Sequence, residues 1–235
     1  VQTCALPIYP GTHVESRDIR EVDARKVRSF LGLKRGELDL IAGGPPCQGF
    51  SINAPKRSAE DSRNHLFREY LRFVSEFQPR VVMIENVPGM VSFEGGATLD
   101  SILESLKSLG YDADVRILYA PHYGIPQTRW RTIILGGRGG LSPTELFPEP
   151  LRQAPVRVNF TSKFGGKNLV NLPLSLELPS HVTVRDAIGD LPLLCNGEMG
   201  ELVKPYRHMA DNQYQQLMRV GSDGVTCHEA ARLSK

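Results

Sequence analysis

The sequence predicts an α/β domain built on a parallel sheet, and two observations support that prediction. Short apolar runs alternate along the chain with amphipathic helical patterns, which is the order of a parallel sheet with crossover helices. At 235 residues, with 40% hydrophobic and 23% charged residues, the chain can also bury a core. Wholesale disorder and a fibrous repeat are therefore excluded.

The first predicted elements lie between residues 38 and 84. Residues 38–42 form a short apolar run that ends in two glycines and two prolines, which predicts a buried strand leading into a tight loop. From Leu66 apolar residues recur at helical spacing until Pro79, which predicts an amphipathic helix that the proline terminates. Residues 81–84 are all apolar, which predicts a second buried strand.

The alternation then repeats. Apolar residues at helical spacing over 99–109 predict a second amphipathic helix, and Gly110 stands where helices commonly end. Residues 115–118 and 132–135 predict further strands.

After about Gly140 prolines become frequent and periodic segments become short, which indicates a domain boundary. Thr183 with Asp186 predicts a capped short helix that ends at Gly189. Residues 151–176 carry four basic residues and no acidic one, which suits either a solvated loop or a phosphate-contacting surface. The predicted division is residues 1–8 as a translated sequencing adapter, 9–140 as a partial catalytic domain and 141–235 as a Pro-rich connection with the beginning of a further region.

Charge and cysteine content narrow the class of protein. The formal net charge is only +2, so it does not by itself indicate nucleic-acid binding. The four cysteines are scattered without a C-x-x-C pair, so the sequence supports neither a zinc site nor a disulfide framework, and we expect a reducing, cytoplasmic setting. No apolar run approaches the roughly 20 residues that a membrane span needs, so we expect no membrane association.

Residues that carry reactive groups occur at three places, which we expect at the carboxyl ends of strands and therefore at one edge of the sheet. Cys47 follows two prolines that stiffen the backbone and present the thiol; a buried, inert cysteine is the alternative. Glu85 directly follows a strand and either caps a turn or faces a cleft. Arg129 and Arg131 share one face, with Trp130 directed oppositely, and suit either an ordinary surface or a clamp on a phosphate or carbonyl.

Together these groups suit addition to an electron-poor heterocycle. A thiolate attacks the ring, a carboxylic acid protonates a ring nitrogen, and two guanidinium groups hold a carbonyl and a neighbouring phosphate. The three motifs read GGPPCQGFS at 43–51, ENVPG at 85–89 and QTRWR at 127–131. With these motifs in this order, the chain resembles the DNA (cytosine-5-)-methyltransferase family, the C5 cytosine-specific DNA methylases. The likeness extends from about residue 10 to 140, and more faintly to 192.

The resemblance implies a Rossmann-like methyltransferase fold, incomplete here and followed by the start of a target-recognition region. It implies transfer of a methyl group from S-adenosylmethionine to carbon 5 of a cytosine flipped out of duplex DNA. By the same resemblance Cys47 attacks carbon 6, Glu85 engages the ring N3, and Arg131 with Arg129 holds the base and its surroundings. No metal is implied.

The resemblance also implies two sets of binding residues. For the cofactor these are Asp18, Ile19, Pro45 and Leu66. For DNA they are Gln48, Ser51, Lys56, Arg57 and Arg63. The glycine-rich turn of the family would stand before Asp18, and its last motifs beyond Lys235. We therefore expect the chain to be truncated at both ends and to bind S-adenosylmethionine weakly by itself.

The expected partners are double-stranded DNA and a cognate restriction endonuclease acting on the same site, for a monomeric enzyme of prokaryotic or phage origin. A tRNA cytosine-5 methyltransferase of the same family and a non-catalytic DNA-binding remnant remain as alternatives. A thiol redox protein is least supported, because Cys47 has no nearby resolving cysteine. These residues do not indicate which DNA sequence is recognised.

Overall fold

The computed structural model describes residues 12–45, 66–175, 177–198, 203–226, 228–230 and 232. The chain divides into two compact units. The first, which we call the sheet unit, comprises Val1–Ile117, Arg131–Pro148 and Val158–Val170. The second unit comprises Leu118–Trp130, Glu149–Arg157 and Asn171–Lys235.

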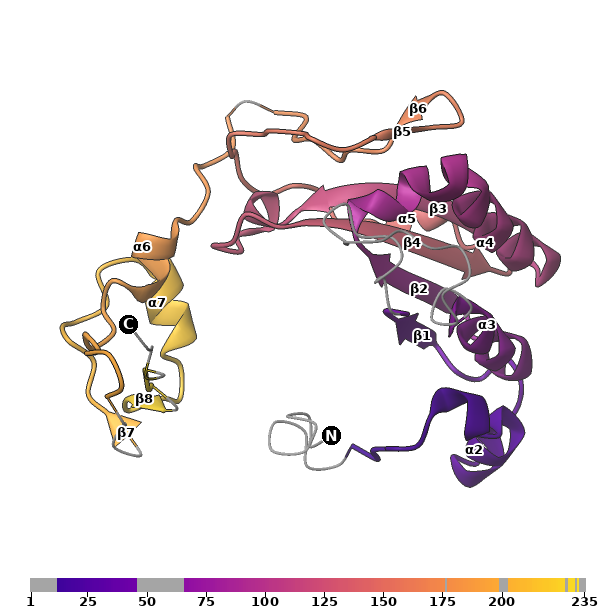
Figure 1. Ribbon diagram of the computed structural model, residues 1–235, viewed down its shortest axis with the longest axis horizontal. Coiled ribbons are helices and arrows are strands. Elements are labelled where there is room, and N and C mark those ends of the chain that lie inside the picture. The colour runs from indigo at the N-terminus through magenta and orange to yellow at the C-terminus, as the bar shows by residue number, and fades with distance from the viewer. Residues whose placement is uncertain are drawn as a thin grey trace. The chain divides into compact units, whose positions relative to one another are not determined.

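The described part of the chain contains a four-stranded sheet with strand order β1-β2-β4-β3 (Figure 1). The strands are β1 (Leu40–Gly43), β2 (Val81–Asn86), β3 (Tyr111–Tyr119) and β4 (Trp130–Arg138). The predicted α/β class is confirmed, but the sheet is mixed: β1 runs parallel to β2, whereas β4 runs antiparallel to it. The expectation of a wholly parallel sheet was wrong because residues 120–129, between β3 and β4, are too few for the crossover helix that a parallel pair needs.

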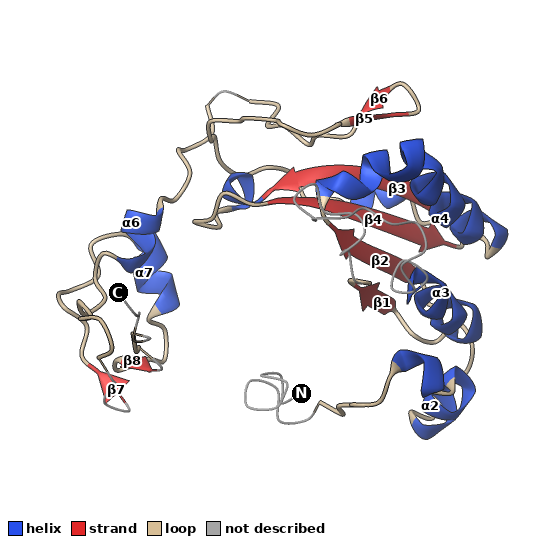
Figure 2. Cartoon of the chain, in the orientation of Figure 1, coloured by secondary structure: helices blue, strands red, loops and turns tan. Residues whose placement is uncertain are grey.

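Two amphipathic helices pack with this sheet and contact each other (Figure 2). Helix α3 (Leu66–Phe77) ends just before Pro79, as the sequence predicts. Helix α4 (Ala97–Ser108) is followed by Gly110 in the left-handed conformation, with φ of +85°. Their buried residues recur at helical spacing, namely Tyr70, Val74 and Phe77 in α3 and Thr98, Leu99, Ile102 and Leu106 in α4.

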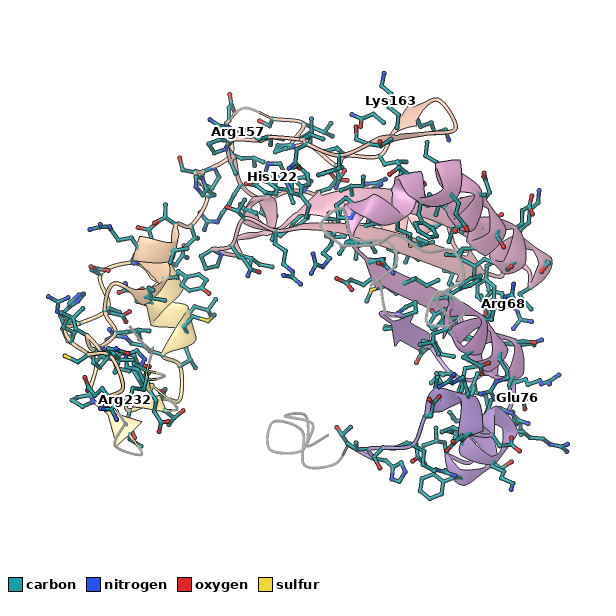
Figure 3. All side chains as sticks on the ribbon, viewed as in Figure 1. Arg68, Glu76, His122, Arg157, Lys163 and Arg232 are labelled. Atoms are coloured by element: carbon teal, nitrogen blue, oxygen red, sulfur yellow. The ribbon has the colours of Figure 1, made fainter. Side chains whose placement is uncertain are left out.

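A short helix that the sequence analysis did not predict, α2 (Ala24–Phe30), is held against α3 by ion pairs. Arg28 and Arg35 donate to the two carboxylate oxygens of Glu76, at 2.8 and 2.7 Å (Glu76 is labelled in Figure 3). These hydrogen bonds, that from Arg35 first, lower the pKa of Glu76. Charge pairing thereby ties the N-terminal segment to the helix that borders β1.

The second unit contains the predicted capped helix. In α6 (Val184–Ile188) the Thr183 side chain accepts from the backbone of Asp186 and the Asp186 carboxylate accepts from the backbone of Thr183, which forms a complete capping box. Among the described residues no helix is long and apolar enough to cross a bilayer. The remaining elements are η1 (Ile19–Glu21), η3 (Pro88–Gly96), η4 (Ala120–Tyr123), α5 (Pro143–Leu146), β5 (Lys163–Phe164), β6 (Lys167–Asn168), β7 (Val203–Lys204), α7 (Gln213–Met218) and β8 (Val225–Thr226).

Tyr70 of α3 fastens the carboxyl end of β1 to β2. Its hydroxyl lies 2.9 Å from the Ile41 carbonyl and 3.0 Å from the Met83 carbonyl, and burial raises the pKa of this phenol. The ring covers Gly43 so closely that a Cβ there would stand 2.6 Å from a ring carbon. Glycine at 43 and tyrosine at 70 therefore depend on each other.

We expect Tyr70→Phe to lower the free energy of unfolding by about 1–2 kcal/mol, because two partly buried carbonyls lose the hydroxyl that lies between them. Urea denaturation of the protein measures this. Tyr206→Phe is the matched control, since its hydroxyl bonds to Ser222 at the surface, and it should stay within about 0.5 kcal/mol of the parent. Equal effects of the two substitutions would contradict the role of Tyr70.

Candidate active site

Glu85 and Arg131 meet at one edge of the sheet. In the β2–β4 register Glu85 stands opposite Ile133, so Arg131, two residues earlier on β4, is its diagonal neighbour on the same face. The Arg131 guanidinium Nε pairs with Glu85 Oε1. The Arg131 side chain is 22% exposed and that of Glu85 41% exposed, so the pair is reachable from solvent yet held on one side by the sheet.

Arg131 reaches this edge by a different route from the one predicted from the sequence. It stands at the amino end of β4, not at the carboxyl end of a strand. Because β4 is antiparallel to β2, its amino end lies beside the carboxyl end of β2, and Arg131 still converges on Glu85. Arg129 belongs to the second unit, directly before β4, and has an exposed side chain.

Asn86 holds the end of β1 at the same edge. Its side chain is buried, donates from Nδ2 to the Pro45 carbonyl at 3.2 Å, and accepts from the Val87 backbone at 2.9 Å. A Cβ added to Gly44 would lie 3.3 Å from Glu85 Oε2, so the β1 loop passes directly over the carboxylate. No role for Asn86 was predicted from the sequence, although a polar residue at the end of an apolar strand was a signal for one.

Several predicted residues lie outside the described part of the chain. These are Cys47, Gln48, Ser51, Lys56, Arg57 and Arg63. Pro45 is the last described residue before them, so the described structure fixes the point from which the segment with Cys47 departs.

An apolar pocket of about 440 Å³ opens beside β1. Three residues predicted to bind the cofactor, Ile19, Pro45 and Leu66, line it together. Asp18, the fourth, is not among the lining residues. Its carboxylate accepts from the Arg20 backbone at 2.9 Å and from the Arg20 guanidinium, and hydrogen bonds from the Arg20 side chain and backbone lower the pKa of Asp18 to about 2.

Comparison with known proteins identifies the family. The sequence profile of the C-5 cytosine-specific DNA methylases matches residues 7–215. The chain belongs to this family. Within it, the chain is 38% identical to the type II methyltransferase M.AgeI of Thalassovita gelatinovora, over 99% of this chain and 54% of that protein. It is also 33% identical to mouse DNA (cytosine-5)-methyltransferase 1, over 89% of this chain and 14% of that protein.

A solved structure is similar in fold. It is described as a DNA modification methyltransferase encoded within a prophage of E. coli, and it matches with a TM-score of 0.59 and 24% identity over 87% of this chain and 50% of that chain. The neighbour supports the Rossmann-like methyltransferase fold. The chain spans about half the length of M.AgeI.

We expect Asn86→Ala to lower the free energy of unfolding by about 1–3 kcal/mol, because the Pro45 carbonyl and the Val87 N–H lose their partner in a buried place. Asn86→Asp keeps an acceptor for Val87 but has no amide donor for Pro45, so an intermediate loss is expected. Asn168→Ala is the control, because its side chain bonds to the Val170 backbone at the surface. Thermal unfolding with no difference between the variants at 86 and 168 would contradict the anchoring role.

Proposed function

We propose that the protein containing this chain transfers a methyl group from S-adenosylmethionine to carbon 5 of a cytosine flipped out of DNA, through a covalent bond to Cys47. The observation that carries this proposal is the Glu85–Arg131 pair at the edge where Asn86 holds Pro45, two residues before Cys47. On this basis we assign a nucleophile, Cys47, to the same edge of the sheet as the Glu85 carboxyl group and the Arg131 guanidinium group. Membership of the DNA methylase family supports the assignment.

In the proposed reaction each group has a defined task. The Cys47 thiolate forms a bond to carbon 6 of cytosine, and Glu85 holds a proton at the ring N3, where the negative charge of the opened double bond develops. Carbon 5 is then nucleophilic and accepts the methyl group. A base removes the hydrogen of carbon 5, the double bond returns, and the bond from sulfur to carbon 6 breaks.

Arg131 orients the acid and supplies positive charge. Its guanidinium group fixes the Glu85 carboxyl group through Nε, and its positive charge suits the carbonyl oxygen at position 2 of the base. Arg129, exposed directly before β4, suits the phosphate next to the flipped nucleotide.

The pocket beside β1 fits the adenosine part of the cofactor. Aliphatic and aromatic side chains dominate its lining, and the faces of an adenine ring pack well on such groups. Ile19, Pro45 and Leu66 would hold the ring, and the adjacent Asp18 carboxylate can exchange Arg20 for a donor on the ligand. When bound, S-adenosylmethionine supplies an electrophilic methyl group.

The names of the bacterial relatives suggest a cellular role for the protein. Bacterial relatives carry the name type II methyltransferase, so we propose that the protein modifies DNA in the cytoplasm as a monomer and protects one site from a cognate endonuclease. Methylation of tRNA instead of DNA, and DNA binding without transfer, are the outcomes that would replace this proposal.

We expect Glu85→Gln to slow single-turnover methyl transfer by roughly 10²–10⁴-fold, the usual range for loss of a positioned acid. The amide keeps the shape but has no proton to hold at N3. The measurement uses radiolabelled S-adenosylmethionine with unmethylated genomic DNA and, separately, with unmodified tRNA. Glu37→Gln, on the loop before β1, is the control and should transfer at the parent rate. Parent-like transfer by Glu85→Gln would return Glu85 to a structural role, and transfer to tRNA alone would favour an RNA substrate.

We expect Leu66→Glu to weaken binding of S-adenosylmethionine at least about tenfold, because a carboxylate in an apolar pocket loses its hydration. Isothermal calorimetry on the whole protein measures the dissociation constant. Leu146→Glu, on the partly exposed α5, is the matched control and should bind as the parent does. Equal affinity of the two variants would show that the cofactor lies elsewhere.

A further inference from the structure

Aromatic rings meet where β3 ends and β4 begins. Tyr119, the last residue of β3, and Trp130, the first of β4, stack with ring centroids 4.2 Å apart and 24° between their planes. The ring of His122, in η4, meets Tyr119 edge-on with centroids 5.2 Å apart. We call Tyr119, His122 and Trp130 the aromatic clasp; Figure 3 labels His122 just beyond the end of β3.

Hydrogen bonds also stabilise the connection between β3 and β4, where the clasp lies. The Ala120 backbone donates to the Arg129 carbonyl at 2.9 Å, which joins the two ends of the connection. The His122 carbonyl accepts from the Leu151 and Arg152 backbones at 2.8 and 3.0 Å. Tyr119 and His122 are buried, and burial lowers the pKa of His122, so that the ring packs as an uncharged group near pH 7. These contacts restrict the backbone at the start of β4.

Trp130 stands between Arg129 and Arg131 in the sequence. Successive side chains of a strand point to opposite faces, so the direction of the Trp130 ring determines the direction of Arg131. A stacked ring leaves little freedom to rotate, because the aromatic planes must stay parallel to keep their contact. Rotation of β4 at Trp130 would turn the guanidinium away from Glu85.

We propose that the Tyr119–Trp130 stack is a positioning element for the reaction, which holds the start of β4 in the rotation that presents Arg131 to Glu85. Trp130 and Tyr119 are positioning residues, because they act through Arg131. The inference rests on the proposed function, since Arg131 and Glu85 matter to the rate only if they handle the base.

The test is single-turnover methyl transfer to unmethylated genomic DNA with enzyme in excess, where the first-order rate constant does not depend on the fraction of folded protein. Trp130→Ala should transfer about 10–100-fold more slowly, the scale of a displacement near 1 Å at a reacting group, with DNA affinity within about threefold of the parent. Trp130→Phe should restore most of the rate, because it keeps a ring for the stack. Phe147→Ala, which empties a buried site beneath Arg116, is the control and should keep the parent rate constant.

Tyr119→Leu provides a second variant if Trp130→Ala does not fold. It retains Trp130, the one tryptophan of the chain, so fluorescence anisotropy reports the mobility of that ring directly. We expect the anisotropy to fall and the rate constant to fall with it. A fall in anisotropy with an unchanged rate constant would overturn the positioning role.

A double-mutant cycle separates positioning from general destabilisation. If the clasp acts through Arg131 and Glu85, Trp130→Ala combined with Glu85→Gln should be little slower than Glu85→Gln alone. Multiplicative losses would mean that the stack is only structural. Undiminished transfer by Glu85→Gln and by Cys47→Ala would instead overturn the proposed function. Failure of the positioning role and failure of the proposed function therefore give different results.

Discussion

The antiparallel register of β2 and β4 is the constraint on which the candidate site depends. It places Asn86 opposite Thr132 and Glu85 opposite Ile133, so that Arg131 falls diagonally across from the carboxylate. A slip of one residue would carry Arg131 to the other face of the sheet. The ion pair is partly exposed and its energetic contribution is modest. Its value lies in orientation, because the contact from the Arg131 Nε restricts the direction of the Glu85 carboxylate.

Contacts at the end of β1 position the chain just before the proposed nucleophile, Cys47. Tyr70 packs over Gly43 and reaches carbonyls of both β1 and β2, while Asn86 holds the Pro45 carbonyl. The end of β1 is thereby fixed relative to Glu85 by side chains from a helix and from a strand. Rigid elements of this kind position a reacting group more accurately than a free loop does.

Local patterns in the sequence predicted most of the regular elements near the site. Pro79 and Gly110 ended α3 and α4 as expected, and the Thr183–Asp186 capping box began α6. Strand β3 begins at Tyr111, before the predicted residue 115, because polar residues such as Asp112 and Asp114 are tolerated in an edge strand. Helix α2 was not predicted because it is short. It is stabilised by the ion pair between Arg28 and Glu76, a residue of another helix.

Long-range geometry was the part that local patterns did not reveal. The sequence identified Glu85 and Arg131 as candidates, yet the strand that carries Arg131 runs in the opposite direction to the one expected. The burial of Asn86 likewise depends on a contact with Pro45, 41 residues away. Such features follow from pairing between distant segments, which periodicity within one segment does not encode.

The most direct test of the proposed site uses DNA in which 5-fluorocytosine replaces cytosine. Fluorine at carbon 5 does not leave as a proton, so after methyl transfer the bond between Cys47 and carbon 6 should persist. With S-adenosylmethionine present, we expect the whole protein to form an adduct that resists denaturation, with a peptide map placing the bond on Cys47. Glu85→Gln should form this adduct roughly 10²–10⁴-fold more slowly. An adduct on Cys195 or Cys227, or one that forms at the parent rate without the Glu85 carboxyl group, would contradict the assignment.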